Sequence, residues 1–303
     1  MAVSDDKLSV ALVGASAGGG GWGPVAHMPA IAAVEQLELV ALCTSSPASA
    51  AAAAETYGIP RAYHDVRELA AQSDIDLVSV AVKVPHHHSL VMPLLEAGKH
   101  VYCEWPLGAT VEEAEEMASV ARAIGVVAVV GLQGRHDPAL THVRDLVEDG
   151  WLGDILSVNV TMIGGGALER RASEAWMAED ANGANTMTIV VGHTIDAAEY
   201  CFGQLSEISA TVGVQLPRWH LVDAGEIVEA DAPDNILING ILAGGGLMSY
   251  QAARSYARMA EAIGDGTTAG PDFGHALELH RLLDSARESS DERRAIRVVT
   301  DRD

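Results

Sequence analysis

The chain has 303 residues, of which 42 are acidic and 19 are basic, so its formal net charge is −23. This acidic balance argues against a surface for nucleic acid or for an anionic membrane, because both need basic patches. Hydrophobic residues make up 49% of the chain and aromatic residues only 4%. Such a composition is typical of alternating strands and helices and excludes a mainly disordered chain. A chain of this length is expected to form two domains.

Cysteine usage and the first residues predict a cytoplasmic protein. The three cysteines are widely spaced and odd in number, which indicates neither a disulfide framework nor a zinc knuckle. The stretch from Met1 to Lys7 is short and acidic and lacks the basic start and apolar run of a signal peptide. No stretch of about 18 residues is free of charges and turn residues, so no membrane span is expected.

The first half alternates predicted strands with predicted helices. Short apolar runs predict strands over residues 8–13, 38–43, 61–63, 77–82, 100–103 and 126–132. Helices are predicted over residues 24–34, 47–57, 65 onward, 88–97 and 110–124, with Ser46 as an N-cap and Gly58 as an end. Strands separated by helices require crossover connections. This predicts a doubly wound parallel sheet that binds ligands at the carboxyl ends of its strands.

The second half shows longer, partly alternating strand patterns. Strands are predicted over residues 155–163, 207–216, 235–243 and 247–253, and helices over residues 185–202, 256–263 and 273–289. Consecutive strands with few helices predict an α+β domain with an open, mostly antiparallel sheet. We place the boundary near Gly150, which gives domains of residues 1–150 and 151–303.

A glycine-rich turn follows the first predicted strand and precedes a helix. Such a turn lets backbone N–H groups approach a pyrophosphate at a helix N-terminus, so we expect it to bind a dinucleotide. The expected contacts are Gly14, Ser16, Gly21 and Trp22. Ser16 replaces the second glycine of the usual GxGxxG pattern and the turn is longer, which leaves a merely flexible loop as the alternative.

The end of the second predicted strand carries Thr44, Ser45 and Ser46. An acidic residue at this place would hold the ribose 2′-hydroxyl of NAD, and a nearby arginine would accommodate the 2′-phosphate of NADP. Hydroxyl side chains do not repel a phosphate and can donate to it, so we favour NADP slightly over NAD. Ser46 can equally serve only as the cap of the next helix.

Several motifs together resemble the glucose–fructose oxidoreductase/inositol dehydrogenase (Gfo/Idh/MocA) family. They are the glycine-rich turn, AGKHVYCEWPL over residues 97–107, GLQ over 131–133, GWLG over 150–153 and GHTID over 192–196. HMPAI over residues 27–31 and EWP over 104–106 are most similar to the branch that contains the galactose-regulon repressor, a regulator rather than a working enzyme. The resemblance implies an NAD(P)-binding Rossmann domain and a second domain whose sheet forms homo-oligomers.

This sequence departs from the family at two catalytic positions. The family's lysine follows the glutamate that corresponds to Glu104, and here Trp105 takes its place. The family's aspartate lies four residues before the histidine that corresponds to His193, and here that residue is Ile189, which cannot shuttle a proton. The usual lysine-dependent mechanism is therefore not implied.

His193 and Lys83 are the remaining candidates for proton chemistry. Hydride transfer at an alcohol carbon requires a group that takes or gives the hydroxyl proton. His193 occupies the family's histidine position at the start of an apolar helix, with a merely structural hydrogen-bonded histidine as the alternative. Lys83 ends an apolar run, where a lysine is costly unless it faces a cleft, pairs with a carboxylate or reaches solvent.

The resemblance also implies the rest of the site. The cofactor side is expected to include Val84, Pro85, His87, Glu104, Trp105 and Gln133. Trp105 and His193 are expected near the substrate, although Trp105 can equally fill core space. By their position at the end of the last predicted strand, Gln133 and Arg135 are also expected to face the substrate, and Arg135 can equally pair with an acid. The consecutive histidines 86–88 cannot easily converge on one ion, so we expect no metal.

We therefore expect an NAD(P)-dependent oxidoreductase that acts on a small carbonyl or hydroxyl compound, such as a sugar or cyclic polyol, without the family's lysine. The alternatives are a catalytically silent, dinucleotide-sensing regulatory protein and a lysine-independent reductase of a conjugated substrate. The part after Gly150 is short for the family's second domain, so its sheet is expected to be reduced or to lack a stretch.

Overall fold

The computed structural model describes residues 7–18, 21–156, 158, 160, 162, 169–241 and 271–298. The chain divides into two compact units. Of the described residues, the first unit takes those up to 108, those from 112 to 133 and those from 271 to 277, and the second takes the rest. The glycine-rich turn therefore belongs to the first unit, and His193 belongs to the second.

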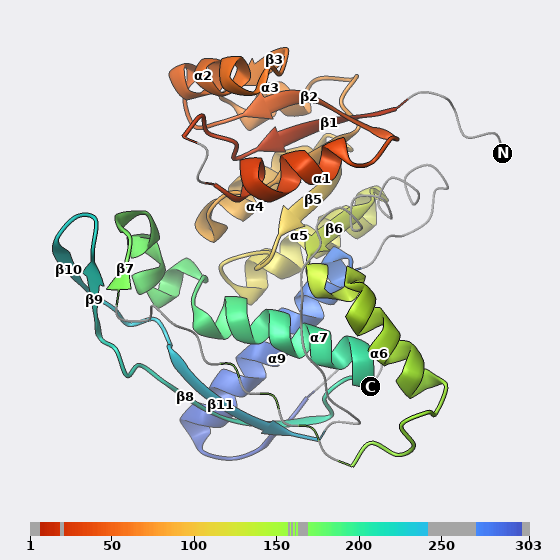
Figure 1. The fold of residues 1–303 in the computed structure, drawn as a ribbon, viewed down its shortest axis with the longest axis vertical. Helices are drawn as coiled ribbons and strands as arrows, with labels where there is room; N and C mark the ends of the chain where they lie inside the picture. Colours follow the sequence, from red (N-terminus) through yellow and green to blue (C-terminus); the bar gives the residue numbers. More distant parts are fainter. Residues whose placement is uncertain are drawn as a thin grey trace. The chain divides into compact units, whose positions relative to one another are not determined.

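The first unit contains a six-stranded parallel sheet with the strand order β3-β2-β1-β4-β5-β6 (Figure 1). Its strands are β1 (Leu8–Val13), β2 (Leu37–Cys43), β3 (Arg61–Tyr63), β4 (Leu77–Val80), β5 (His100–Glu104) and β6 (Ala128–Gly131). The helical segments are η1 (Gly23–His27), α1 (Met28–Ala32), α2 (Pro47–Tyr57), α3 (Val66–Ala70), η2 (Val84–His86), α4 (His87–Glu96) and α5 (Val111–Ile124). The predicted doubly wound fold is confirmed. From β1, the strands β2 and β3 follow on one side, and β4, β5 and β6 follow on the other. The strand order therefore reverses beside β1, and sheets of this kind bind ligands at such a switch point.

Local sequence signals define α2 as predicted. Ser46 has extended backbone angles, and its Oγ accepts a hydrogen bond from the backbone N–H of Ser49 at 3.2 Å. The Oγ of Ser49 accepts in turn from the backbone N–H of Ser46, also at 3.2 Å. Pro47 takes the first helical position, and Gly58 ends the helix with φ at +67°. These caps satisfy backbone groups that a helix end leaves unpaired.

The sheet is covered on both faces, as its apolar strands predict. The consecutive residues Val10–Val13 of β1 are all buried, which requires packing on each side of the strand. Ile31 of α1 packs with Leu77 of β4 and Tyr102 of β5, and Ala53 of α2 packs with Leu12 and Leu42. Each fully buried leucine or isoleucine of this kind contributes about 1.5–3 kcal/mol, so the strand ends that carry the turn are fixed by a well-packed core.

The second unit combines helices with two small sheets. Its helical segments are η3 (Gln133–His136), which leads in from the first unit, α6 (Pro138–Glu148), η4 (Ala172–Ala178), η5 (Asp180–Asn182), η6 (Thr186–Val191), α7 (Gly192–Phe202) and most of α9 (Phe273–Glu292). Its strands are β7 (Glu169–Arg170), β8 (Glu207–Gly213), β9 (Arg218–Leu221), β10 (Glu226–Glu229), β11 (Asn235–Gly240) and β12 (Ile296–Arg297). The sheet β11-β8-β12 is antiparallel, and β9 pairs antiparallel with β10 and parallel with β7. The predicted α+β class is confirmed, and α6 lies beside α7 through Leu140 and Phe202 (Figure 1).

Several strand predictions for the second unit are wrong or lie outside the described residues. Residues 155, 156, 158, 160 and 162 are described and lie in no strand, so the strand predicted over 155–163 is wrong for them. Leu156 and Met162 are exposed there, and an alternating pattern forms a strand only when one face is buried. The strand predicted over 247–253 and the helix predicted over 256–263 lie outside the described residues.

The hairpin of β9 and β10 was not predicted. Each strand has only four residues, and charged residues stand at the first position of β9 and at both ends of β10. Trp219 of β9 is buried against Ala178 and Ala230, and the guanidinium carbon of Arg170 lies 4.7 Å from the centre of its ring. Tertiary packing around one tryptophan, rather than local pattern, therefore defines this hairpin.

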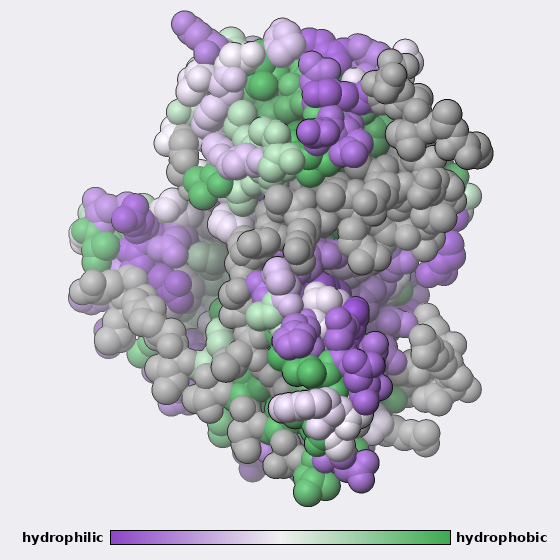
Figure 2. Space-filling view, turned by 45° about the vertical axis from the view of Figure 1, so that its right-hand side comes forward, coloured by the Kyte–Doolittle hydropathy of each residue, from purple (hydrophilic) through white to green (hydrophobic). Residues whose placement is uncertain are grey.

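The described surface mixes hydrophilic and apolar residues on the face shown in Figure 2. Trp151, Leu156 and Leu237 are among the large apolar side chains that are exposed. Among the described residues, no helix combines the length and the apolar character that crossing a bilayer requires.

Candidate functional site

The backbone after β1 approaches the backbone after β4 so closely that only glycine fits at position 14. Gly14 has φ at +107°, and a Cβ there would lie 2.2 Å from the carbonyl oxygen of Ala81. Its N–H donates to the carbonyl of Cys43 at the end of β2, at 3.0 Å. A Cβ at Gly23, where η1 begins, would lie 3.0 Å from the carbonyl oxygen of Gly14. A helix start thus lies against the carboxyl ends of β1, β2 and β4, where backbone N–H groups can face an anion.

The other predicted residues of this turn differ in their exposure and contacts. The carbonyl of Ser16 accepts a hydrogen bond from the hydroxyl of Tyr57 at 2.8 Å, which ties the turn to α2. Gly21 is partly buried, and Trp22, just before η1, is 39% exposed. A contact between Trp22 and a ligand stays a prediction.

The hydroxyls at the end of β2 bond mainly to one another and to α2. The Oγ1 of Thr44 lies 2.6 Å from the Oγ of Ser49, and the Oγ of Ser46 donates to the same atom at 2.9 Å. The capping alternative for Ser46 is therefore confirmed. Ser45 is exposed. No carboxylate stands at Thr44, Ser45 or Ser46, so this strand end does not repel a 2′-phosphate.

Lys83 lies three residues after the end of β4. The strand β4 ends at Val80, two residues earlier than predicted, and the Lys83 side chain is exposed. This exposure fits the predicted alternative in which the lysine reaches solvent or pairs with a carboxylate, and a role of Lys83 in the cleft stays a prediction. Val84 is buried and Pro85 is partly buried in the short helix η2 that follows.

His87, the first residue of α4, is fully buried among backbone carbonyls. Its Nε2 lies 3.1 Å from the carbonyl oxygen of Val82, and its Nδ1 lies 2.8 Å from that of Pro106. Burial lowers the pKa of His87, and a neutral imidazole has one N–H to donate. The ring therefore connects the chain after β4 to the chain after β5, and it supports this edge of the sheet through the backbone that it holds.

Glu104, the last residue of β5, lies at the centre of a polar cluster. Its Oε1 is 2.9 Å from Nε2 of His27, and Nε2 of Gln133 donates to both carboxylate oxygens at 3.1 Å. His27 is fully buried, and its Nδ1 lies 3.0 Å from Oγ of Ser79 in β4. A Cβ at Gly131 would lie 2.7 Å from Oε1 of Glu104, so a glycine at the end of β6 makes room for the carboxylate. The cluster joins η1, β4, β5 and the first residue of η3 at the carboxyl edge of the sheet.

Trp105 is only 5% exposed. This burial favours the predicted alternative in which the indole fills core space. An indole N–H can donate a hydrogen bond but cannot accept a substrate proton. Proton chemistry at this position is therefore absent.

Arg135 pairs with an acid, the alternative to its predicted substrate contact. Its Nε and Nη2 both lie 2.7 Å from Oδ1 of Asp196, which is 1% exposed. The guanidinium carbons of Arg135 and Arg144 lie 5.4 and 4.9 Å from the centre of the Tyr200 ring. His193 is partly buried, three residues before Asp196 in the first turn of α7. A substrate contact of Arg135 stays a prediction.

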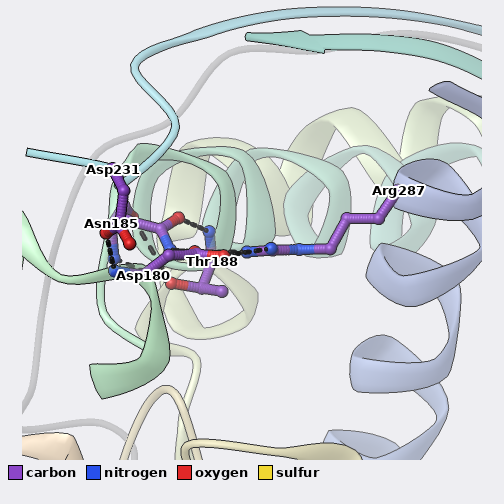
Figure 3. A network of polar contacts seen from close by, with 5 residues as sticks. All are labelled: Asp180, Asn185, Thr188, Asp231 and Arg287. Carbon is purple, nitrogen blue, oxygen red and sulfur yellow. Dashed lines mark hydrogen bonds and ion pairs between the residues drawn. The ribbon is translucent and has the colours of Figure 1, made fainter. Parts of the chain in front are cut away.

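A polar network holds the segment that leads to His193 (Figure 3). The side chain of Asn185 accepts from the backbone N–H of Thr188 at 3.0 Å and caps η6, which continues into α7. Its Nδ2 donates to Asp180 at 2.7 Å, and Arg287 of α9 donates to both oxygens of the same carboxylate at 2.7 and 2.9 Å. This carboxylate raises the pKa of Arg287. The start of η6, and with it the helix that bears His193, is therefore anchored by a charged, bidentate pair.

Some of these residues were not predicted to matter. His27 was noted only within a motif, and Asp180 and Arg287 had no role, because nothing local indicates that distant residues will meet. A polar histidine one helical turn after a glycine-rich turn is the signal that could have identified His27. In the part of the chain that the structure describes, no group of three or more His, Cys, Asp or Glu side chains could hold a metal ion.

The described residues of the first unit fit a bound dinucleotide. The turn carries glycine at position 14, where any side chain would collide with the carbonyl oxygen of Ala81, as a tight turn after the first strand of such a fold requires. Gln133 is 1% exposed, and its Oε1 is buried with no hydrogen-bond partner among the described residues. A buried amide oxygen without a donor is costly, so a ligand that brings an N–H or O–H donor to this edge suits the site.

Known proteins match both parts of the chain. Residues 8–132 match the family described as "Oxidoreductase family, NAD-binding Rossmann fold", and residues 138–261 match the one described as "Gal80p, C-terminal domain". Dehydrogenase aclE of Aspergillus oryzae is 36% identical over 212 residues, which are 68% of this chain and 58% of that protein. The galactose/lactose metabolism regulatory protein GAL80 of Saccharomyces cerevisiae is 30% identical over 255 residues, 78% of this chain and 58% of that protein. The chain thus spans 58% of the length of both relatives.

Solved structures share the fold. A levoglucosan dehydrogenase in complex with NADH and L-sorbose superimposes with a TM-score of 0.85 at 19% identity, over 97% of this chain and 100% of that one. A super-repressor mutant of Gal80p from Saccharomyces cerevisiae gives 0.85 at 24% identity, over 96% and 98%. At these identities the similarity concerns the fold alone. The family and sequence matches show that the chain belongs to the Gfo/Idh/MocA oxidoreductase family, near its Gal80 branch.

Proposed function

We propose that the protein transfers a hydride between NAD(P) and a small carbonyl or hydroxyl compound, a sugar or cyclic polyol, without the lysine that its family uses. The observation that carries the proposal is the glycine-rich turn at the switch point of the sheet, where only glycine fits at position 14 and a helix begins against it, because such sheets bind a dinucleotide at this place. The substrate class is supported by relatives with sugar-related names. D-glucoside 3-dehydrogenase of Escherichia coli, for example, is 31% identical over 208 residues.

Both NAD and NADP suit the end of β2, with a slight preference for NADP. Thr44 and Ser45 bring neither an acid that selects the ribose 2′-hydroxyl nor an arginine that selects the 2′-phosphate. When bound, the nicotinamide ring supplies the hydride acceptor or donor. The chain's contributions are the turn from Gly14 to Trp22, Glu104 and Gln133, which bind and orient.

His193 is the residue we assign to the proton. A ring nitrogen of His193 takes the hydroxyl proton when an alcohol is oxidised and returns it when a carbonyl is reduced. The Asn185–Asp180–Arg287 network holds the helix that bears it. Lys83, an exposed residue after β4, adds a positive charge that polarises the substrate oxygen.

The protein is further proposed to act in the cytoplasm as a homo-oligomer. The sheet of β8 and β11 supports the second point, because Leu237 of β11 is 71% exposed and Ile241 follows it at 59%. Apolar side chains on an open sheet favour burial against another copy. Three buried cysteines without a disulfide suit a reducing compartment.

A second candidate, a dinucleotide-binding regulator without catalysis, is supported by a specific observation. Buried Trp105 and the apolar Ile189 occupy the positions of the family's lysine and aspartate. The relative GAL80 is named as a regulatory protein. A regulator with this acidic charge is expected to act through another protein, in a manner that depends on the dinucleotide.

The deciding experiment follows absorbance at 340 nm with NAD and NADP over a panel of sugars, polyols and ketones. A substrate-dependent change supports the oxidoreductase, and its loss in His193→Ala supports the assigned proton role. Full activity of His193→Ala would instead favour reduction of a conjugated substrate. Cofactor binding with no absorbance change across the panel, but with cofactor-dependent capture of one partner protein, would favour the regulator.

A further inference from the structure

The amide of Gln133 presents its two ends to different surroundings. Its Nε2 donates to both oxygens of Glu104 at 3.1 Å, whereas its buried Oε1 has no partner among the described residues. The orientation is not arbitrary, because a carboxylate accepts hydrogen bonds and cannot donate them when ionised. Turning the amide over would place its oxygen against the two oxygens of Glu104.

Glu104 is itself held in place, so its carboxylate fixes the orientation of the Gln133 amide. His27 contacts Oε1 at 2.9 Å and is backed by Ser79 at 3.0 Å. Gly131 leaves the space that the carboxylate occupies, since a Cβ there would lie 2.7 Å from Oε1. The cluster therefore fixes an acceptor, and not a donor, at the unpartnered end of Gln133.

The position of Gln133 indicates which group of a bound dinucleotide would donate a hydrogen bond to its Oε1. A doubly wound sheet consists of two mononucleotide-binding halves, and Gln133 follows β6, the last strand of the second half. Gly14 and the strand end at Thr44 belong to the first half. The second half is where the nicotinamide nucleotide of a dinucleotide binds, and the carboxamide of that base carries an N–H₂ group.

We infer that Oε1 of Gln133 accepts a hydrogen bond from the carboxamide of the nicotinamide, with Glu104 and His27 as positioning residues that fix its orientation. The inference rests on the proposed binding of a dinucleotide, but it does not depend on hydride transfer. In this inference, the cluster determines the orientation of the bound nicotinamide ring, and with it which face of the ring is open to a substrate.

Binding measurements with three probes test the inference. The probes are NAD⁺, 3-acetylpyridine adenine dinucleotide, in which a methyl group replaces the amide nitrogen, and ADP-ribose, which lacks the base. Wild type is expected to bind NAD⁺ about tenfold more tightly than the acetylpyridine analogue, the effect of one hydrogen bond to a buried acceptor. Gln133→Met is expected to abolish this preference and to leave ADP-ribose affinity within about twofold.

Two further variants control the measurement. Gln72→Met makes the same substitution at a side chain that donates to the carbonyl of Glu68 away from this edge, and it should keep the preference. Glu104→Gln replaces the carboxylate that fixes the amide orientation, so the preference for NAD⁺ over the acetylpyridine analogue should narrow. Unchanged ADP-ribose binding also shows that each variant is folded.

The outcomes separate the inference from the proposed function. Equal binding of NAD⁺ and the analogue by wild type overturns the inference, and so does a parallel loss of ADP-ribose affinity in Gln133→Met, which would assign the acceptor to a ribose hydroxyl. If wild type binds neither NAD⁺ nor ADP-ribose, the dinucleotide proposal itself fails. A carboxamide preference without turnover supports the inference and contradicts only hydride transfer.

Discussion

Replacing Gly14 by alanine perturbs the closest backbone approach at the switch point. The new Cβ would lie 2.2 Å from the carbonyl oxygen of Ala81, although real Cβ atoms essentially never come within 3.0 Å of such an atom. With φ at +107°, alanine also pays a conformational cost of about 1–2 kcal/mol. Displacing a packed strand end costs about 1–3 kcal/mol more, so we expect a loss of about 2–5 kcal/mol.

Gly58→Ala is the matched control, because Gly58 has φ at +67° and nothing within 4 Å of a Cβ. It should lose only about 1–2 kcal/mol. With about 2–4 °C per kcal/mol for a protein of this size class, thermal unfolding should show a clearly larger drop in Tm for Gly14→Ala. The variant should also lose affinity for ADP-ribose, whereas Gly58→Ala should keep it. Equal drops in Tm and unchanged ADP-ribose binding would refute the reasoning about this turn.

Three other outcomes follow from buried groups. Asp196→Ala should lower the free energy of unfolding by about 2–4 kcal/mol in chemical denaturation, because Arg135 then lacks its buried carboxylate; a loss under about 1 kcal/mol contradicts the pair. A thiol reagent at about pH 8 should label no cysteine of the native protein, since burial raises the pKa of Cys43 to about 12 and all three thiols are buried; rapid labelling contradicts this. Acidification from about pH 7 to about pH 5 should lower Tm, because burial lowers the pKa of His100 in the fold while the unfolded chain takes up the proton. His100→Asn should reduce the change of Tm between about pH 7 and about pH 5. An unchanged drop in Tm would assign the pH dependence to other groups.

The first unit could be predicted from the sequence because its local signals agree with its tertiary packing. The bounds of β1 match the prediction, and α2 begins at the predicted cap and ends at Gly58. The second unit was harder to predict. Short strands such as β9 form around Trp219, and an alternating pattern such as residues 155–163 carries no information on whether a partner strand exists.

The candidate site also has a part that could be predicted from the sequence and a part that could not. The glycine-rich turn could be found from spacing, because a close backbone approach demands glycine at one place in the chain. The roles of Lys83 and His27 could not, since the exposure of one and the burial of the other depend on where η1 and β4 end. Sequence pattern identifies which residues stand at the strand ends, but the direction of each side chain is decided by its neighbours.

The measurement that tests the account most directly is absorbance at 340 nm for wild type and His193→Ala, with NAD and NADP, over one panel of sugars and cyclic polyols. The account predicts a substrate-dependent change for wild type with at least one compound and a loss of about 100-fold or more in rate for His193→Ala. A folded wild-type protein that binds the dinucleotide and changes no absorbance with any compound of the panel would contradict it.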